Sequence, residues 1–548
     1  MDKTAYREII EKMLEGTITT RSELDLEKRD FAQKHGMDHF IRNSEILKHV
    51  KPSEKKRVLG LLLKKPARSL SGVAVIAAMT RPSECPHGKC KYCPGGPDAD
   101  VPQSYTGKEP ATRRAIQYGF HPYLQTTFRL HQLKTIGHPI DKAELIVMGG
   151  TLTAQCLDYQ DWFVKNCLEA MNDYNGNAAR IDEVGEESFV RQYHARKHPF
   201  KYREDVQKGN EGSRVRCVGV TFEPRPDWAG REQIGFMLDF GVTRVEVGVQ
   251  NPDDKIYELV DRGHTVADVI EATRLLKDSG IKVGYHMMPG IMGNDPELDL
   301  NAFKKIFTVD GFKPDMIKIY PCIVLAGTEF HDRWMAGEFE PITTSEAVDL
   351  IVKVKAMLPK WVRTMRIMRD IPSNLVEAGI KNSNLGQLVY NRMEEEGFKC
   401  DCIRCREVGR SLMKGIHPHV EDIKIARTDY GASGGKEVFL SFEDTRADIL
   451  IGFCRLRIPN EPFRPEITHD SALIRELHVY GPMVELDEKP EYEWQHRGYG
   501  KELIAEAERI ARTEFDKKKI LVTSGIGVRN YYRDSGYERD GPYMSKKL

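Results

Sequence analysis

The chain has 548 residues, which is more than a single hydrophobic core usually supports, so we expect at least two domains. Hydrophobic residues make up 40% and charged residues 30% of it, a balance typical of packed globular domains rather than disordered chains. Because 82 Lys and Arg balance 82 Asp and Glu, affinity for nucleic acid would have to come from a local patch. No apolar run approaches the roughly 20 residues that cross a bilayer, and the start has no signal-peptide core, so we expect a cytoplasmic protein without a membrane partner.

Residues 1–70 combine charged residues with apolar residues at helical spacing, which predicts a small helical domain. Within it, residues 42–68 carry nine Lys and Arg against two Glu. This basic stretch is either a solvated helix face or a surface that binds phosphates, and charge alone does not decide between the two.

In residues 71–395, short β-branched runs alternate with helical stretches. The predicted strands cover residues 73–79, 145–148, 215–222, 242–249, 282–288, 316–320 and 364–368. Such alternation predicts βαβ units and a parallel sheet, closed or partly closed as a barrel. The polar and aperiodic residues 172–214 are predicted to form a long loop with room for one helix, of the kind that is often functional or mobile.

The last part of the chain has a third pattern. Predicted strands at residues 437–442, 449–456 and 474–486 lead to a glycine-containing turn, a long amphipathic helix at 501–515 and a further strand at 519–523. This order predicts a separate α+β domain over residues 421–548, joined to the barrel by a linker at 396–420. The whole chain is thus predicted to be an α/β multidomain protein.

Cys85, Cys90 and Cys93 stand in the pattern Cys-x4-Cys-x2-Cys directly after the first predicted strand. A chain of this size needs no disulfide staples, so metal ligation is the better explanation for such a group. Three thiolates can hold three irons of a [4Fe-4S] cluster and leave the fourth iron open for the amino and carboxylate groups of S-adenosylmethionine. A zinc site with His87 as the fourth ligand is the alternative.

Two later segments suit such a site. Gly149 and Gly150 follow the second strand, where a backbone could approach the methionine moiety, and Glu223 and Arg225 follow the third, within reach of a nucleoside. Barrels place their chemistry at these C-terminal strand ends. The cysteine segment resembles the cluster loop of the radical S-adenosylmethionine superfamily, which implies a partial (β/α) barrel, although its first spacing is four residues instead of the commonest three.

Gln495, Gly498 and Gly500 lie between a predicted strand and the long helix, in the pattern Gln-x-x-Gly-x-Gly. Glycines at such a junction let backbone N–H groups and the helix N-terminus face a pyrophosphate, and acetyl-CoA carries one. Together with the segment around Tyr531 and Tyr532, this region resembles the Gcn5-related N-acetyltransferase fold. The resemblance implies that Tyr532 protonates the leaving thiolate. Tyr531 is expected to be a packing or binding residue, and a core tyrosine is the alternative for Tyr532.

Taken together, the motifs resemble the catalytic subunit of the Elongator complex, in its single-chain archaeal or bacterial form. The segments that carry the resemblance are CPHGKCKYCPGGPD, QSYTGKEPATRRAI, IVMGGT, ELHVYG, QHRGYGKELIAEAERIA and GVRNYYRDSGYERDGPYM. The family implies an acyltransferase that forms 5-carboxymethyluridine at the wobble position, position 34, of tRNA. By the same matching, acetyl-CoA would be bound by Lys142, Glu476, Leu477, His478, Val479, Gln495, Gly498, Tyr499, Gly500 and Tyr532.

Cys400, Cys402 and Cys405 place three thiols within six residues. Tetrahedral zinc needs a fourth ligand, for which Cys322 is the first candidate and His417 or His419 the next. We expect a structural zinc here; a second iron–sulfur cluster and free thiols are the alternatives.

The resulting hypothesis couples two chemistries. The reduced cluster cleaves S-adenosylmethionine, the resulting radical takes hydrogen from the methyl group of acetyl-CoA, and the carbon radical adds to C5 of a flipped uridine before CoA is released by hydrolysis. The basic N-terminal domain would hold the anticodon arm, and an electron donor is required. A protein lysine acetyltransferase with a structural cluster and a tRNA-binding scaffold with a degenerate radical site are the rivals. The sequence leaves open whether the protein forms a homodimer.

Overall fold

The computed structural model describes residues 3–37, 39–63, 71–293, 295–481 and 498–548. Four short helices form the N-terminal part around their own apolar core: α1 (Lys3–Leu14), α2 (Arg21–Lys34), α3 (Asn43–Leu47) and α4 (Lys55–Leu62). A capping box fixes the start of α2, because Thr20 accepts from the backbone of Glu23 while the Glu23 carboxylate accepts from the backbone of Thr20. The predicted helical N-terminal domain is confirmed as a helical unit.

The central part is an open sheet of seven strands in the order β1-β2-β3-β4-β5-β6-β8, every neighbouring pair parallel. The strands are β1 (Ala74–Met79), β2 (Lys142–Met148), β3 (Arg216–Phe222), β4 (Val242–Gln250), β5 (Lys282–Met287), β6 (Met316–Ile319) and β8 (Arg363–Ile367). The crossover helices include α6 (Pro122–Thr135), α7 (Leu157–Asn172), α11 (Arg231–Asp239), α13 (Val266–Asp278), α14 (Pro296–Thr308) and α16 (Thr344–Ala356). This half-barrel confirms the predicted fold class, and all seven predicted strands are present.

Residues 172–214 are helical, contrary to the predicted loop. They form α8 (Tyr174–Val184), α9 (Glu186–Ala195) and α10 (Arg203–Glu211). The missed signal is a set of widely spaced apolar anchors, because Ile181 and Phe189 are buried against Tyr123 and Phe128 of α6, and Tyr174 is the one other fully buried residue of α8 and α9. Helices that bury so few residues have too little periodicity to stand out in a sequence.

The C-terminal part is a second seven-stranded sheet, in the order β10-β11-β12-β13-β14-β16-β15, in which only β13 and β14 pair in parallel. Its strands are β10 (Ile423–Ala432), β11 (Gly435–Asp444), β12 (Ile449–Ile458), β13 (Ser471–Val479), β14 (Lys519–Val522), β15 (Glu538–Asp540) and β16 (Tyr543–Lys547). The helices α20 (Tyr499–Thr513) and α21 (Arg529–Arg533) accompany it. The predicted α+β composition is confirmed.

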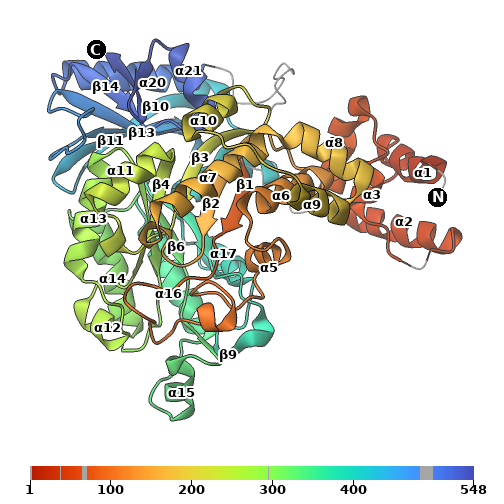
Figure 1. Cartoon of the computed structure of the whole chain (residues 1–548), viewed down its shortest axis with the longest axis horizontal. Coiled ribbons are helices and arrows are strands. Elements are labelled where there is room, and N and C mark those ends of the chain that lie inside the picture. The colour runs from red at the N-terminus through yellow and green to blue at the C-terminus, as the bar shows by residue number, and fades with distance from the viewer. Residues whose placement is uncertain (1–2, 38, 64–70, 294, 482–497) are drawn as a thin grey trace.

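The C-terminal sheet lies against the N-terminal ends of the half-barrel strands. Lys282, at the start of β5, approaches Glu476 of β13 at 4.0 Å, and a Cβ on Gly527 would collide with Arg216 at the start of β3. In Figure 1 the C-terminal sheet (blue) caps one side of the half-barrel, and the N-terminal helices (red) project away from it beside α8 and α9. The opposite, C-terminal edge of the half-barrel is therefore not covered by the C-terminal sheet.

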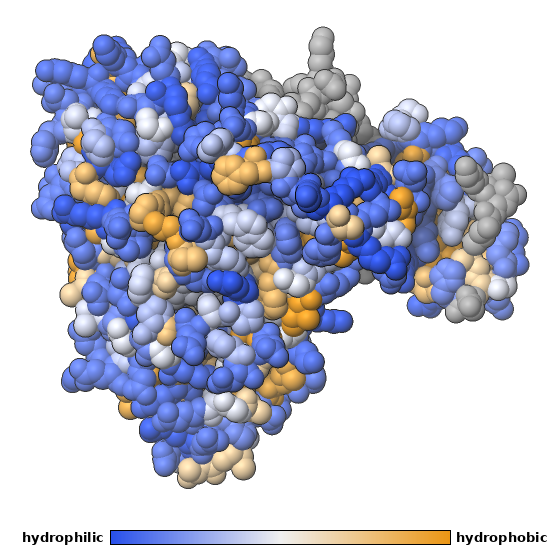
Figure 2. Space-filling view, viewed as in Figure 1, coloured by the Kyte–Doolittle hydropathy of each residue, from blue (hydrophilic) through white to orange (hydrophobic). Residues whose placement is uncertain are grey.

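The surface is mainly hydrophilic on the face shown in Figure 2, with apolar residues scattered in small groups. Among the described residues, no helix is both long enough and apolar enough to cross a bilayer.

Candidate active site at the two ends of the half-barrel

A cavity of about 1080 Å³ opens at the C-terminal edge of the parallel sheet. Four of the residues predicted for the radical site line it: Cys85, Gly149, Gly150 and Glu223. They come from the ends of three different strands, and the sheet brings them together because parallel strands end at one edge. The cavity also has a wall of cations, in which Arg225, Arg262, Arg366 and Arg369 take part.

The cysteine loop lies between β1 and this cavity. Cys90 and Cys93 are buried, and Cys85 is partly exposed. Desolvation raises the pKa of Cys85 and raises that of Cys93 to about 11. The Cys90 sulfur accepts a contact from Arg262 Nη1 at 3.5 Å, which would offset negative charge on a thiolate there.

The donor set suits an iron–sulfur cluster better than a single ion. The three sulfurs are not among the described groups whose ligand atoms all lie within 4.8 Å, whereas the thiols around one tetrahedral zinc would be about 3.8 Å apart. His87, the alternative zinc ligand, lies with Nε2 3.1 Å from the Cys90 sulfur. Burial lowers the pKa of His87 to about 4, so its ring is neutral at pH 7. Three thiols at this spacing suit the predicted [4Fe-4S] cluster.

Gly149 and Gly150 form the turn after β2, both with positive φ, at 106° and 57°. A Cβ on Gly149 would lie 2.6 Å from the Thr80 hydroxyl, which itself donates to the Gly149 carbonyl at 2.8 Å. A side chain is thus excluded at Gly149 by both φ and space. The turn keeps its backbone open to the cavity, as its predicted role requires.

The inner face of the half-barrel carries a buried charged cluster that the sequence analysis missed, apart from Glu223. Lys318 Nζ lies 2.8 Å from Glu223 and also pairs closely with Glu246, while His286 Nε2 lies 2.9 Å from Glu246. Burial alone would lower the pKa of Lys318, but the two carboxylates outweigh it and raise that pKa well above the usual range. Burial alone would raise the pKa of Glu246, but Lys318 and Arg244 lower it well below. Lys318 and Glu246 are therefore both ionised at neutral pH.

A signal for this cluster exists in the sequence. Strand β4 alternates Val245, Val247 and Val249 with Arg244, Glu246 and Gly248. A parallel strand buried on both faces is normally apolar throughout, so charges at every second position mark a polar inner face.

At the other end of the half-barrel, β13 and β14 diverge. Their register ends at Ile474 opposite Val522, and a β-bulge at Arg475 interrupts the pairing of β13 with β12. Beyond it, the predicted acetyl-CoA residues Glu476, Leu477, His478 and Val479 continue without β14 beside them. The start of α20, with Gly498 (φ 95°), Tyr499 and Gly500, lies beside this part of β13, since a Cβ on Gly500 would lie 3.8 Å from the Val479 side chain. Gln495 lies outside the described residues.

The two tyrosines of α21 are placed differently from their predicted roles. A Cβ on Gly500 would lie 2.7 Å from the Tyr531 hydroxyl, so Tyr531 reaches the beginning of α20. Tyr532 is 6% exposed and packs among the core residues of the C-terminal sheet, with Tyr537 at 5.8 Å between ring centroids. Burial raises the pKa of both. The Tyr531 hydroxyl is therefore the one that lies at the start of α20, because helix rotation turns neighbouring residues to different sides, and the catalytic role predicted for Tyr532 stays a prediction.

Lys142 is the first residue of β2 and lies at the end of the sheet that faces the C-terminal part, away from the cavity. Desolvation and Arg216 lower its pKa. On β13, Glu476 pairs with Arg455 at 2.7 Å, and His478 Nε2 lies 3.2 Å from the Ser71 carbonyl. Both residues are thus held by the fold at the junction between the two sheets.

Cys400, Cys402 and Cys405 form a compact group, with all sulfurs within 4.8 Å. Hydrogen bonds from the other two thiols, together with Lys355, hold the pKa of Cys402 well below the usual range, which favours a thiolate. Cys322 is not in this group; it packs with Cys90 and Cys93, so its prediction as the fourth ligand is wrong. His419 lies 3.1 Å from Asp444 instead, and His417 is exposed. Lys355 Nζ lies close to two of the thiols, 3.4 Å from the Cys402 sulfur and 3.2 Å from the Cys405 sulfur.

Comparison with known proteins agrees with this geometry. Residues 2–70 match the ELP3 N-terminal domain, residues 81–301 the Radical SAM superfamily and residues 314–395 the Radical_SAM C-terminal domain. The tRNA uridine(34) acetyltransferase of Methanocaldococcus jannaschii is 50% identical over 566 residues, which cover 100% of this chain and 99% of that protein. Elongator complex protein 3 of Drosophila melanogaster is 40% identical over 552 residues, with coverages of 99% and 95%.

A solved structure also matches. It is the Methanocaldococcus infernus Elp3 with an N-terminal deletion (1–46), which is 48% identical, superposes with a TM-score of 0.74 and covers 87% of this chain and 100% of that one. The resemblance drawn from the motifs is confirmed: the chain belongs to the Elongator complex protein 3 family within the radical S-adenosylmethionine superfamily.

Proposed function

We propose that this protein forms 5-carboxymethyluridine at position 34 of tRNA, with S-adenosylmethionine and acetyl-CoA as co-substrates. The observation that carries the proposal is the presence of two different sites on one half-barrel. At one end, the loop that carries the three thiols borders the cavity. At the other end, β13 separates from β14 beside the start of α20, which begins at Gly498. The names of the relatives from Methanocaldococcus support tRNA uridine as the substrate.

In the radical half, Cys85, Cys90 and Cys93 would hold a [4Fe-4S] cluster, which supplies the electron that cleaves S-adenosylmethionine. The backbone at Gly149 and Gly150 would border the methionine moiety, since no side chain can stand at Gly149. Glu223 would accept hydrogen bonds from a ribose while Lys318 keeps its carboxylate oriented at 2.8 Å.

The buried cluster of Glu246, His286 and Lys318 would orient the uracil ring. Lys318 and His286 both line the cavity and carry N–H groups that can donate to uracil carbonyls. Glu246 holds both side chains in place, so the base would be fixed with one edge on the protein and C5 toward the centre of the cavity. Such a base must leave its stack, as with other enzymes that modify a nucleobase.

In the acetyl-CoA half, the edge of β13 from Glu476 to Val479 would pair with the amide groups of the pantetheine arm. The N-terminal end of α20 at Gly498, Tyr499 and Gly500 would face the pyrophosphate. Tyr531, whose hydroxyl lies at Gly500, is the better placed tyrosine to donate a proton to the departing thiolate. Lys142 would contribute positive charge at the same junction.

For Cys400, Cys402 and Cys405 we retain a structural zinc, with water in the fourth position in place of Cys322. A buried thiolate at Cys402 and two adjacent thiols suit a zinc ion. The group lies between α16 and the C-terminal sheet, where it would join the two large parts of the chain.

The test is anaerobic incubation of the full chain with tRNA, acetyl-CoA, S-adenosylmethionine and a reductant, followed by nucleoside mass spectrometry. We expect 5-carboxymethyluridine only when all four are present. Product formed without S-adenosylmethionine would overturn the radical mechanism. Acetyl transfer to lysine in place of any uridine product would instead favour a protein lysine acetyltransferase with a structural cluster.

A further inference from the structure

A second basic surface lies on α9 and on the connection to α10, far along the sequence from the basic N-terminal stretch. Between Ser188 and Arg203 the chain has five Lys and Arg and no Asp or Glu. We call residues 191–203, together with the pocket beneath them, the α9–α10 surface. From the sequence alone, this region is predicted to be a loop, and it has no predicted binding partner.

Part of the positive charge on this surface has no acidic partner. Arg203 pairs with Asp161 at 2.8 Å and Lys201 with Glu169 at 3.3 Å, so those two cations are neutralised. Arg196 and Lys197 are exposed and form no ion pair within the described part of the chain. These two charges are therefore available for an external anion.

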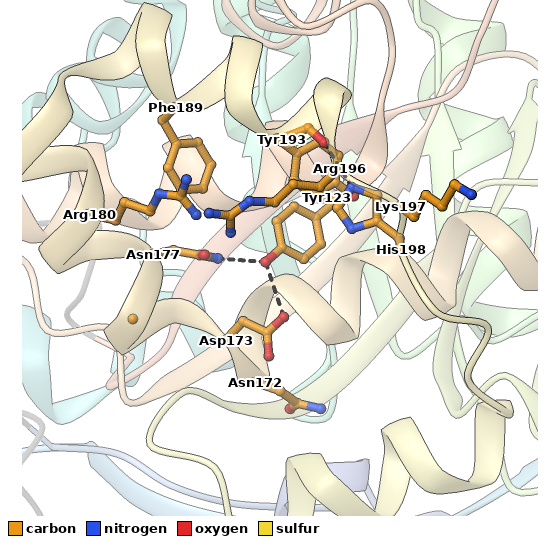
Figure 3. A pocket seen from close by; sticks show the side chains of 11 residues that line it. Tyr123, Asn172, Asp173, Asn177, Arg180, Phe189, Tyr193, Arg196, Lys197 and His198 are labelled. Atoms are coloured by element: carbon orange, nitrogen blue, oxygen red, sulfur yellow. Dashed lines mark hydrogen bonds between the residues drawn. The ribbon is translucent and has the colours of Figure 1, made fainter.

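A pocket of about 540 Å³ lies directly below these cations. Figure 3 shows Tyr123 and Tyr193 in its wall, with the guanidinium groups of Arg180 and Arg196 close to each other beside the rings. Tyr123 and Tyr193 stack at 4.7 Å between centroids, and His198 lies against Tyr193 at 4.1 Å. Two guanidinium groups beside aromatic rings, one of them Arg180 at 6.0 Å from the centre of the Phe189 ring, suit a nucleotide, which carries a phosphate and a flat base.

The connection between α9 and α10 also exposes two large aromatic residues. Phe200 is 75% and Tyr202 66% exposed, and their rings meet edge to face at 5.2 Å. Lys165 lies over the Phe200 ring at 4.4 Å. Exposed aromatic rings that follow unpaired cations in the chain, here Arg196 and Lys197, are typical of proteins that bind unpaired nucleotides.

Aromatic contacts connect the α9–α10 surface to the cysteine loop. From the surface inward the rings of the row are His198, Tyr193, His121, Trp162 and Tyr159, each neighbouring pair 4.1 to 5.6 Å apart between centroids. Arg81, four residues before Cys85, covers the last ring at 4.4 Å. Both α8 and the N-terminal helices also pack on α6, since α8 contributes Ile181 to the Phe128 cluster and Leu47 borders Gly137 after α6. A row of ring contacts thus links His198 of the α9–α10 surface to Arg81, which precedes the cysteine loop.

We propose that the α9–α10 surface binds unpaired nucleotides of the RNA substrate, with a base against the aromatic rings and a phosphate between Arg180, Arg196 and Lys197. The proposal rests on tRNA as the substrate. It adds a second contact outside the cavity, which would hold the RNA chain on the side of the cysteine loop while the target base is inserted.

The test uses the full chain and fluorescein-labelled single-stranded oligouridylate, followed by fluorescence anisotropy as a function of salt and without acetyl-CoA or S-adenosylmethionine. Arg196→Ala/Lys197→Ala should weaken binding and lower the salt slope by about 1.4, since each single-strand phosphate contact contributes roughly 0.7. Phe200→Ala/Tyr202→Ala should weaken binding about 5- to 100-fold at an unchanged slope, because stacking is independent of counterions.

The matched control is Lys424→Ala/Lys436→Ala, which removes two exposed cations from the C-terminal sheet and should leave binding unchanged. Binding of both α9–α10 variants equal to wild type, or competition by polyglutamate as strong as by RNA, would overturn the inference. The outcome is separable from the proposed reaction: oligonucleotide binding that follows this surface supports the inference even if no modified uridine forms, and normal modification with unaffected binding rejects it alone.

Discussion

At the scale of single residues, a substitution of Cys90 can test the radical half of the proposed reaction separately from the acetyl-CoA half. It is buried in the cysteine loop beside Arg262, at the end of the half-barrel opposite to the C-terminal sheet. Cys90→Ser should therefore abolish the visible absorbance of the cluster and the base modification, while acetyl-CoA binding changes little. The measurements are the absorption spectrum after anaerobic reconstitution, nucleoside mass spectrometry and calorimetric titration with acetyl-CoA.

Cys156→Ser is the matched control for Cys90, because Cys156 is an exposed thiol outside both cysteine groups. It should leave spectrum and product unchanged. A Cys90 variant that still makes 5-carboxymethyluridine would refute the radical mechanism.

Tyr531 and Tyr532 provide a second comparison between single residues. If Tyr531 is the proton donor, Tyr531→Phe should slow the tRNA-stimulated release of CoA by about 10²-fold or more, since loss of a general acid typically costs 10²–10⁴ in rate. Tyr532→Phe removes a hydroxyl from a ring packed in the core and should change that rate far less. Thiol release is followed with a thiol-reactive dye, with and without tRNA.

Acetyl-CoA affinity should be similar in both variants, because the pyrophosphate contacts are assigned to backbone at Gly498 and Gly500. If Tyr532→Phe were the slower variant, Tyr532 would be the proton donor, as first predicted. If both variants were equally active, neither tyrosine of α21 would be the general acid.

At the scale of elements, the strands of the half-barrel could be predicted and the helices between them only in part. Strands such as β4 are short, β-branched and buried, and this pattern is local, so the sequence contains it. The helices α8 to α10 were missed because α8 and α9 are anchored by only three fully buried residues, Tyr174, Ile181 and Phe189. Their stability comes from packing on α6, which is tertiary information that a single sequence does not carry.

In the candidate site, too, local features could be predicted from the sequence, whereas contacts between distant residues could not. The cysteine loop, the paired glycines and the glycine turn before α20 are local patterns, and the sequence predicted them. Lys318 and His286 lie in different strands, and only the parallel register brings them to Glu246. Cys322 lies apart from the Cys400 group because of the way the strands are arranged in the sheet. The spacing of the cysteines along the chain does not determine that arrangement.

Strand β13 illustrates how one element joins the two large parts. Its bulge turns Arg475 toward the half-barrel, where the guanidinium lies 2.7 Å from both carboxylate oxygens of Asp315. Asp315 is fully buried and also pairs with Lys277 at 3.3 Å. Burial alone would raise the pKa of Asp315, but Arg475 and Lys277 lower it well below the usual range.

Asp315→Asn should therefore destabilise the folded protein by about 3 kcal/mol, because it leaves the buried Lys277 and Arg475 with Glu437 as their shared counter-charge. In the wild type the folded pKa lies below the unfolded value of about 3.9, so this stability is present above that value and disappears as pH falls toward the folded pKa. Thermal unfolding between pH 3 and pH 8 measures both effects. Asp429→Asn, which removes the exposed partner of Arg427, is the control and should cost less than about 1 kcal/mol.

At the scale of the whole molecule, the half-barrel lies between the two proposed co-substrate sites. Cys85 lies at the cavity end of the sheet, whereas Glu476 meets the opposite strand ends through Lys282. Between them runs a buried column of charge in which Arg244 contacts both Glu144 at 2.6 Å and Glu246 at 3.0 Å. Occupancy of one end can thus alter the electrostatic field at the other, since buried charges are weakly screened.

The N-terminal helices give the last prediction at this scale. Their basic stretch, of which α4 forms part, projects from the half-barrel beside α8 and α9 (Figure 1). If it holds tRNA by its phosphates, replacing Lys55, Lys56 and Arg57 with Ala should weaken tRNA binding and lower the salt slope by roughly 0.7–0.9 for each phosphate that is no longer neutralised. Filter binding of labelled tRNA at several salt concentrations measures the slope, and oligouridylate binding should change less, because the α9–α10 surface remains intact. Arg57 also donates to the Leu14 carbonyl, so a Lys55→Ala/Lys56→Ala variant is needed to exclude an effect on helix packing. An unchanged slope in both variants would leave the stretch as a solvated helix face and shift recognition of the substrate to the half-barrel and the α9–α10 surface.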